Sequence, residues 1–285
     1  MNDVAIRQMR EADIEAAMRL KNAEGWNQTE LDWYLFINHD PELCLVACFE
    51  DEVIGTVTGI NYDNEVAWIG MMLVSRDFRG RGVGKMLLEA IIERLDGCHS
   101  IKLDATPAGQ PVYQKLGFVE EFGLHRLIVE ELSSASEELL SGDVRLIEDG
   151  DIPEIVRLDK QAFGSDRTRL IQNLVKNLPG QSWMCVREDR TTGFILGRQG
   201  TRFNHLGPIV AESIEDAKSL ISKVAKDLAA KPVVMDIPVS KVEWQNWLIE
   251  MGFTSHRSLS RMYFKNNQYA KQGDFQYAIC GPELG

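Results

Sequence analysis

The strongest constraint on the fold of this 285-residue chain is an internal duplication, in which the second half repeats landmarks of the first. Matched residues are 138 positions apart near the start of each half, 137 in the middle and 135 near the end. A repeat of this length is the size of a whole domain, so two copies of one fold are expected. The matched pairs are Arg7 with Arg145, Asp13 with Asp151, Leu20 with Leu158, Gly70 with Gly207, and Gly117 with Gly252.

A polar segment of small residues, 133–142, separates the copies and predicts two domains, 1–132 and 142–285. Within the first half, strands and helices alternate, so the fold class is expected to be α/β, an α+β mixed sheet. Apolar periodicity predicts strands at 4–9, 43–50, 53–62, 66–74, 100–105 and 124–130, and helices at 13–22, 29–38, 82–95 and 111–116.

Composition limits the class of protein. With 44% hydrophobic and 26% charged residues and no long apolar run, no membrane span is expected. The first residues lack the basic and apolar regions of a secretory signal, which favours a cytoplasmic protein. A formal net charge of −12 disfavours a nucleic-acid partner. The five cysteines are scattered and odd in number, which predicts reduced, mostly buried thiols and no metal site.

The stretch most informative about chemistry is Val74–Lys85, where a strand end, a glycine-rich turn and a helix start follow one another. Glycines let backbone N–H groups approach phosphate oxygens closely, and the helix N-terminus adds a partial positive charge. The segment therefore predicts a diphosphate site. Its glycines are Gly80, Gly82 and Gly84, and its flanking cations are Arg79, Arg81 and Lys85.

Two common phosphate motifs do not fit these residues. A Walker loop needs a hydroxyl where Met86 stands, and a dinucleotide fingerprint needs a third glycine where Leu87 stands. The residues instead fit Gln/Arg-x-x-Gly-x-Gly/Ala, as Arg79-x-x-Gly82-x-Gly84, and this resembles the acetyl-CoA loop of the GNAT superfamily of N-acetyltransferases. The segment 113–118 resembles that superfamily's late helix-to-strand motif, and the resemblance covers most of residues 4–130.

The resemblance implies tandem GNAT-like folds and direct transfer of an acetyl group from acetyl-CoA to an amine. A backbone N–H near Val74 would polarise the thioester carbonyl, and the loop would hold the pyrophosphate. Tyr113 would protonate the leaving thiolate, because a thiol of pKa about 8.5 and a phenol of pKa about 10 are close. The residues implied to bind the cofactor are Met72, Leu73, Val74, Arg79, Gly80, Arg81, Gly82, Val83, Gly84 and Lys85.

The acceptor side is predicted from position in the family's pattern. Residues 25–28 and the pair at 32 and 33 stand where the superfamily usually shapes its acceptor pocket. Two carboxylates near the strands that flank the splayed centre of the sheet are candidates for the base that deprotonates the amine, with water as the alternative. The predicted substrate-binding residues are Trp26, Asn27, Asp32, Trp33, Glu65 and Asp104.

The second half lacks both motifs. Aligned on the repeated helix, the glycine loop becomes 213–219, where Ser213 and Asp216 predict a helix cap with an acidic first turn that would repel a pyrophosphate. Leu248 stands at the position of Tyr113. A degenerate GNAT-like domain that walls the acceptor cleft is therefore expected. Its least ordinary stretches, 163–167 and 278–285, are interpreted as helix capping and a terminal strand.

Several alternatives stay open within this hypothesis. The expected acceptor is a primary amine on a small molecule, but the donor site would look the same for another acyl group or for a protein or peptide amine. From another class, the chain could be a non-catalytic acetyl-CoA sensor, although a sensor has no use for an acid at Tyr113. Fold alone does not decide the acceptor.

Overall fold

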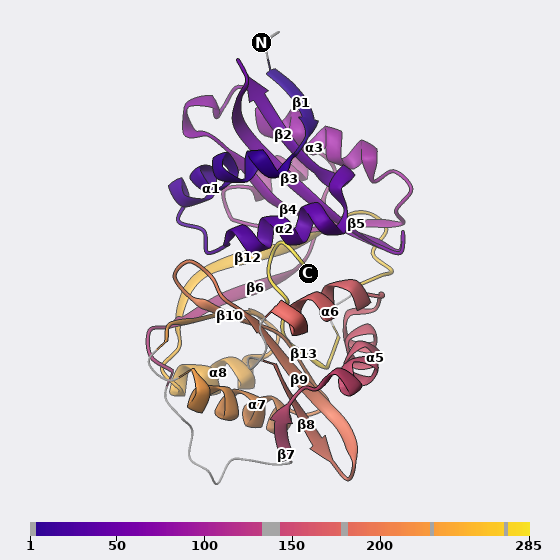
Figure 1. The fold of residues 1–285 in the computed structure, drawn as a ribbon, viewed down its shortest axis with the longest axis vertical. Helices are drawn as coiled ribbons and strands as arrows, with labels where there is room; N and C mark the ends of the chain where they lie inside the picture. The colour runs from indigo at the N-terminus through magenta and orange to yellow at the C-terminus, as the bar shows by residue number, and fades with distance from the viewer. Residues whose placement is uncertain (1–3, 133–142, 178–181, 229–230, 271–272) are drawn as a thin grey trace.

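The computed structural model describes residues 4–132, 143–177, 182–228, 231–270 and 273–285, so the predicted boundary at 133–142 lies outside the described residues. Figure 1 shows the two halves stacked along the long axis, with strands β6 and β12 running between them and the C-terminus lying at their junction. No helix in the described ranges is long and apolar enough to cross a membrane.

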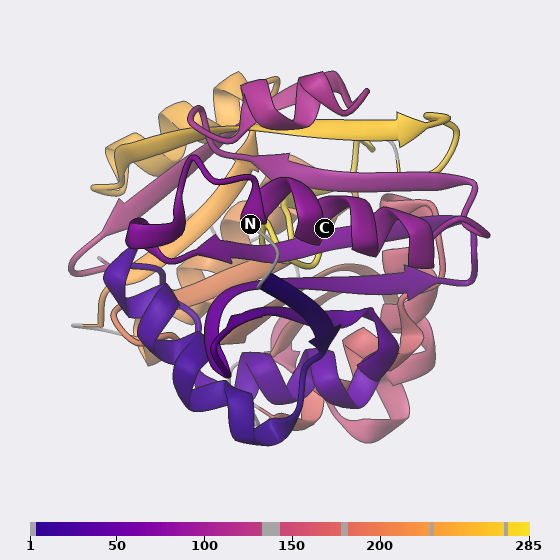
Figure 2. The same cartoon turned by 90° about the horizontal axis from the view of Figure 1, so that it is seen from above.

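The first half has helices on both faces of its strands, as Figure 2 shows from above. Side chains alternate along β2, so Val46 packs in the cluster that contains Trp33 of α2, whereas Leu45 packs in the cluster that contains Leu87 of α3. The elements are β1 (Val4–Gln8), α1 (Ile14–Ala23), α2 (Glu30–His39), β2 (Cys44–Phe49), β3 (Glu52–Tyr62), β4 (Val66–Val74), α3 (Val83–Arg94), β5 (Ser100–Ala105), α4 (Gln110–Lys115) and β6 (Val119–Val129).

The second half repeats this order of elements, which bears out the duplication. Its helix α7 buries Leu220, Ile221 and Val224 on one face, as the sequence pattern predicts. The elements are β7 (Asp143–Leu146), α5 (Ile152–Phe163), α6 (Thr168–Asn177), β8 (Trp183–Arg187), β9 (Arg190–Arg198), β10 (Asn204–Ala211), α7 (Ile214–Asp227), β11 (Val233–Pro238), α8 (Val242–Glu250), β12 (Thr254–Lys265) and β13 (Gln276–Ala278).

One mixed sheet runs through both halves in the order β1-β2-β3-β4-β5-β12-β6-β11-β10-β9-β8-β7, with β13 beside β10. Strand β12 of the second half lies between β5 and β6 of the first, and β6 lies between β12 and β11. The halves therefore exchange their last long strands. Each half would expose unpaired strand edges without the other.

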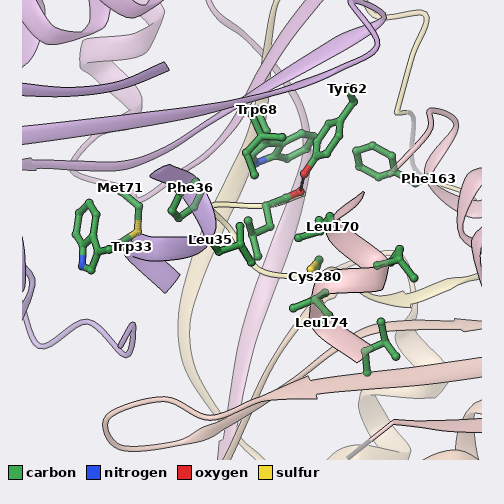
Figure 3. Close-up of a cluster of buried hydrophobic side chains, with 14 of the residues drawn as sticks. Trp33, Leu35, Phe36, Tyr62, Trp68, Met71, Phe163, Leu170, Leu174 and Cys280 are labelled. Carbon is green, nitrogen blue, oxygen red and sulfur yellow. Dashed lines mark hydrogen bonds between the residues drawn. The ribbon is translucent and has the colours of Figure 1, made fainter. Parts of the chain in front are cut away.

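The two halves also share a hydrophobic core. Trp33, Tyr62 and Trp68 of the first half belong to the same buried cluster as Phe163 and Leu170 of the second, and Figure 3 shows Tyr62 and Trp68 near Phe163 and Leu170. The Tyr62 hydroxyl donates a hydrogen bond to the Leu284 carbonyl at 2.8 Å. All five cysteines are free and buried, as the sequence predicts.

Strands β4 and β5 separate after a short parallel pairing in the first half. Their parallel pairing covers only residues 66–68 of β4 and 100–102 of β5, after which β4 continues beside β3 and β5 beside β12. Met71 has a φ of 49°, and the register between β3 and β4 shifts there. This β-bulge changes the direction of the backbone that leads to Val74, next to the glycine loop.

Candidate active site

The glycine loop joins the end of β4 to α3 and keeps the helix terminus free for an anion. Gly80 and Gly82 have φ angles of 72° and 84°, a left-handed conformation that glycine adopts without strain, and a Cβ at either would meet nothing within 4 Å. Gly82 is the N-cap of α3, no side chain caps this helix, and its first turn holds no acidic residue. The first N–H groups of a 12-residue helix thus remain available to a phosphate.

The cations around the loop have different surroundings. Arg79 pairs with Glu24 at 2.6 Å and donates from Nε to the Val74 carbonyl at 3.1 Å, so it fixes the loop against the end of α1. Arg81 lies over the ring of Phe78, and Lys85 makes an exposed pair with its helical neighbour Glu89 at 3.6 Å. All three charges stay near the helix N-terminus, where they favour an anion.

Tyr113 lies on α4 against the same hydrophobic cluster as Met72 and Val74 of β4. Its ring meets Phe118 edge to face at a centroid distance of 5.9 Å. Burial raises the pKa of Tyr113 to about 12, so the phenol is protonated throughout the physiological pH range. Among the described residues no side-chain hydrogen bond of Tyr113 is found, and the side chain is only partly buried.

The second half blocks the corresponding site in two ways. The Ser213 side chain accepts a hydrogen bond from the Asp216 N–H, so the terminus of α7 is capped, and the first turn carries Glu215 and Asp216. The opening between β10 and β11 is also filled, because β13 pairs with β10 and the Ile279 N–H donates to the Asp236 carbonyl at 3.0 Å. Leu248, at the position of Tyr113, is fully buried.

Three of the predicted acceptor residues lie at the junction of the two halves. The Asn27 side chain accepts hydrogen bonds from the N–H groups of Arg202 and Phe203 at 3.0 and 2.9 Å, which fixes the β9–β10 connection against the α1–α2 connection. Asp32 closes a capping box with Thr29 and pairs with Arg198 of β9. Trp26 and Asn27 line a cavity of about 60 Å³ between the halves.

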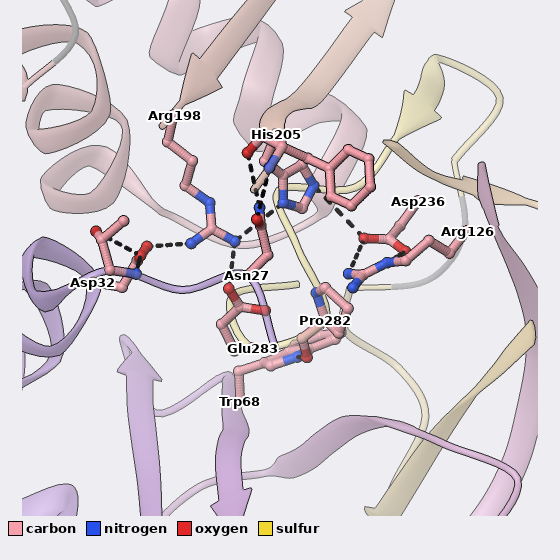
Figure 4. A network of polar contacts seen from close by, with 11 residues as sticks. Asn27, Asp32, Trp68, Arg126, Arg198, His205, Asp236, Pro282 and Glu283 are labelled. Atoms are coloured by element: carbon pink, nitrogen blue, oxygen red, sulfur yellow. Dashed lines mark hydrogen bonds and ion pairs between the residues drawn. The ribbon is translucent and has the colours of Figure 1, made fainter. Parts of the chain in front are cut away.

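A buried polar network adjoins this cavity, and Figure 4 shows it converging from both halves. Arg198 pairs with Asp32 and with Glu283, and its Nη2 donates to Nδ1 of His205 at 3.2 Å. Burial, reinforced by Arg198, lowers the pKa of His205 to about 3, so the imidazole is neutral. Although burial opposes it, the Arg198 charge lowers the pKa of Glu283 to about 2.

The other three predicted acceptor residues line neither cavity described at this junction. Trp33 is fully buried in the shared core. Glu65 accepts a hydrogen bond from the Ser165 hydroxyl at 2.8 Å. Asp104 forms a two-pronged ion pair with Arg261 of β12, 2.9 Å at both contacts. The two carboxylates suggested as bases thus contact residues of the second half.

The C-terminal stretch does not follow its predicted course. The terminal strand β13 ends at Ala278, and the chain then turns into the junction, where the Trp68 indole donates to the Pro282 carbonyl at 3.0 Å. Arg167 donates to the Gly285 carbonyl at 2.6 Å. The two stretches that the sequence singles out therefore meet. Helix capping holds for Asp166, which accepts from the Thr168 N–H at 2.9 Å.

Sequence reasoning missed the second half's part in this junction. Arg198 and His205 fit no motif and lie opposite each other on the paired strands β9 and β10, and the C-terminal turn brings the distant Glu283 to them. Polar residues within otherwise apolar strands, such as Arg198 at the end of β9, were the available signal.

Comparisons with known proteins agree with this geometry. A model of the acetyltransferase (GNAT) family matches residues 7–118, and a model of an acetyltransferase (GNAT) domain matches residues 155–278. The chain is 27% identical to holothin acyltransferase of Pseudoalteromonas, over 92% of this chain and 88% of that protein. It is 33% identical to an acetyltransferase of Pectobacterium atrosepticum, over 44% of this chain and 96% of that protein.

A solved structure shares the whole architecture. The crystal structure of a proposed acetyltransferase from Pyrococcus horikoshii superposes with a TM-score of 0.83 at 25% identity, covering 100% of this chain and 97% of that one. A GCN5-related N-acetyltransferase from Sphaerobacter thermophilus, 14% identical with a TM-score of 0.68, shares the fold. Family models match both halves, and the alignment with the Pectobacterium acetyltransferase covers nearly all of that protein. The chain therefore belongs to the GNAT acetyltransferase family and is an enzyme with two GNAT domains.

Proposed function

We propose that the chain transfers an acetyl group from acetyl-CoA directly to a primary amine of a small molecule, at the place where β4 and β5 separate. The observation that carries this proposal is the contrast between the halves. Helix α3 has an uncapped N-terminus behind a glycine loop, whereas α7 is capped by Ser213 and carries an acidic first turn. One donor site per chain follows.

The residues of the first half fit the donor. The N–H groups at the start of α3 would bind the pyrophosphate, and Arg81 and Lys85 would add positive charge beside it. The bulged end of β4 would present a backbone N–H to the thioester carbonyl oxygen, which becomes negative as the amine adds. Acetyl-CoA itself supplies the activated acyl group, so the protein needs to position it and stabilise charge.

Tyr113 is the proposed acid. It would give its hydroxyl proton to the CoA sulfur as the carbon–sulfur bond breaks. Burial holds the pKa of the phenol near 12, and the same burial raises the pKa of a departing thiol, so the proton transfer remains feasible. We assign the general base to neither Glu65 nor Asp104, because their carboxylates contact Ser165 and Arg261.

The first experiment measures donor binding by calorimetry. We expect one acetyl-CoA site per chain, lost in Gly84→Glu, because the new carboxylate would stand in the first turn of α3. Gly97→Glu is the matched control, since it adds the same charge where a side chain has open space. Two equivalent sites, or unchanged binding in Gly84→Glu, would contradict the assignment of the loop.

The second experiment measures thiol release with a panel of amines. Tyr113→Phe is expected to lower kcat by about 10²- to 10⁴-fold with little change in acetyl-CoA affinity. Tyr34→Phe, which alters an exposed phenol on α2, should leave kcat unchanged. Equal kcat for Tyr113→Phe and the unmutated enzyme would remove Tyr113 as the acid. Single-site binding with no turnover of any amine would favour the sensor, and turnover with longer acyl-CoA thioesters only would favour another acyl group.

A further inference from the structure

The cavity between the halves has an unusual concentration of positive charge. It holds about 60 Å³, room for a small acidic group, since one water needs about 10–15 Å³ on this scale. Arg126 of β6, Arg202 of the β9–β10 connection and Arg257 of β12 line it beside Trp26 and Asn27. No Asp or Glu is among the described residues that line this cavity.

The three arginines differ in how their charge is balanced. Arg126 forms a two-pronged pair with Asp236 at 2.7 Å, and Arg202 forms an exposed pair with Glu130 at 3.0 Å. Arg257 has no ion pair among the described residues, and its Nε is buried without a hydrogen-bond partner. Burial, with the neighbouring Arg126 charge, lowers the pKa of Arg257 to about 10.

Arg257 and Arg126 lie directly opposite each other on the paired strands β12 and β6. Asp236 balances the charge of Arg126, so the charge left over at this partly buried place is that of Arg257, and such a charge opposes folding unless something compensates it. A carboxylate or phosphate would do so, because a guanidinium donates two parallel hydrogen bonds to such a group. The arrangement therefore has the chemistry of an anion site.

The position of the cavity links it to the acceptor. Gly25 lines it, and the preceding residue, Glu24, pairs with Arg79 of the glycine loop. On its other side it shares Asn27 and Arg126 with a smaller cavity lined by Asp32 and Arg198. The polar network around Arg198 includes Glu283, which packs against β4 at Gly70. The contact is so close that a Cβ added to Gly70 would lie 2.8 Å from the Glu283 Cα.

We propose that Arg257, with Arg126, binds an anionic group of the acceptor, so that the natural substrates are amines that also carry a carboxylate or a phosphate. This inference rests on the proposed function, since it names the class of acceptor for the same reaction. The second domain then selects the acceptor, through β12, while the first domain holds the donor.

The test compares matched amines that differ only in charge. The probes are L-amino acids with their amides, and O-phosphoethanolamine with ethanolamine, assayed by thiol release. We expect the enzyme to prefer one anionic series, which identifies the group as carboxylate or phosphate. Arg257→Gln should raise KM for that series by about 10- to 100-fold and leave the neutral partners unchanged. Arg157→Gln, an exposed charge on α5, is the matched control.

A binding experiment separates this inference from the proposed function. With CoA saturating the glycine loop, inorganic phosphate and acetate are titrated at constant ionic strength into the enzyme, Arg257→Gln and Arg157→Gln. We expect one of the two anions to bind, with at least about tenfold weaker binding only in Arg257→Gln. If anions bind in this way but no amine is acetylated, the anion site stands and the proposed reaction fails.

Other results would overturn the inference. These are equal use of anionic and neutral amines, or an equal effect of Arg257→Gln on both members of a pair. If no amine is acetylated, the binding experiment decides alone: the inference is overturned when neither anion binds, or when Arg257→Gln binds them as well as the unmutated enzyme does. Loss of folding is not expected in Arg257→Gln, because the change removes an unpaired charge. Arg257→Lys, which keeps the charge and loses the planar fork, should show an intermediate KM.

Discussion

Asp104 offers a sharp test of the structural argument, because the sequence suggests it as a catalytic base whereas the structure places it in a buried ion pair. Its carboxylate meets Arg261 at 2.9 Å through both oxygens, and the two side chains are 0% and 1% exposed. The pair joins β5 of the first half to β12 of the second. Burial raises the pKa of Asp104 in spite of Arg261, which shows how strongly this place disfavours an isolated charge.

The expected magnitude follows from what Asp104→Asn leaves behind. Arg261 would remain charged and buried without its partner, a change that costs about 3–5 kcal/mol. The faces of Trp68 and Phe122, 4.4 and 5.0 Å from the guanidinium, contact Arg261 with or without Asp104, so they do not change this difference. We therefore expect a loss of about 3–5 kcal/mol. The double variant Asp104→Leu with Arg261→Met removes both charges and should unfold close to the unmutated protein.

Urea unfolding followed by circular dichroism measures both variants. Asp96→Asn is the control, because Asp96 also pairs with a β12 residue, Lys265 at 3.4 Å, but is 91% exposed, so its loss should change stability by less than about 0.5 kcal/mol. Unchanged stability in Asp104→Asn together with loss of turnover would refute the reasoning and restore Asp104 as a base. A double variant less stable than either single one would refute the assignment of the cost to the unpaired charge.

Three further predictions concern the junction. A chain truncated after Glu131 should be unfolded or aggregated by circular dichroism and gel filtration, because β5 and β6 lose β12 between them; a monomeric, active fragment would contradict this. Gly70→Ala should lower the free energy of unfolding in urea by about 1–3 kcal/mol, since its Cβ would lie 2.6 Å from that of Glu283. The pKa of His205 is lowered from 6.5 to about 3 in the folded protein, so below pH 6.5 the unfolded state binds a proton that the folded state does not. The free energy of unfolding should therefore fall by about 1.4 kcal/mol for each pH unit below 6.5. If His205→Gln shows the same dependence of unfolding free energy on pH between 6.5 and 5 as the unmutated protein, this prediction is wrong.

Many helices and strands could be predicted from the sequence because the pattern of apolar residues that forms them is local. Strand β4 was predicted at 66–74 and occupies Val66–Val74, and the helix predicted at 82–95 is α3, Val83–Arg94. Both have a long periodic pattern of apolar residues, and the glycines at 80–84 mark the turn that connects them. Strand β6 was predicted to begin at 124 and begins at Val119. Its polar start is held in the sheet by Tyr263 and Met262 of β12, a partner that the local pattern does not reveal.

The same distinction separates the donor site from the acceptor side. The proposed donor loop is contiguous, so its glycines and cations stand together in one run of residues that the sequence shows directly. The proposed acceptor side is assembled from β6, β9, β12 and the C-terminal turn, and its composition depends on which strands exchange. Arg257 illustrates this, because in sequence it is one basic residue on a polar strand, and only the pairing of β12 with β6 sets it opposite Arg126.

Strand exchange gives the second half a structural role that does not depend on a donor site, because its β12 lies between β5 and β6 of the first half. Its opening between β10 and β11 is filled by the chain that continues into the junction, where Glu283 contacts Gly70 on β4. Substitutions on β9, β12 or the C-terminal turn can reshape the cavity without touching the glycine loop, so variation in acceptor among such tandem enzymes is expected to concentrate in the second half.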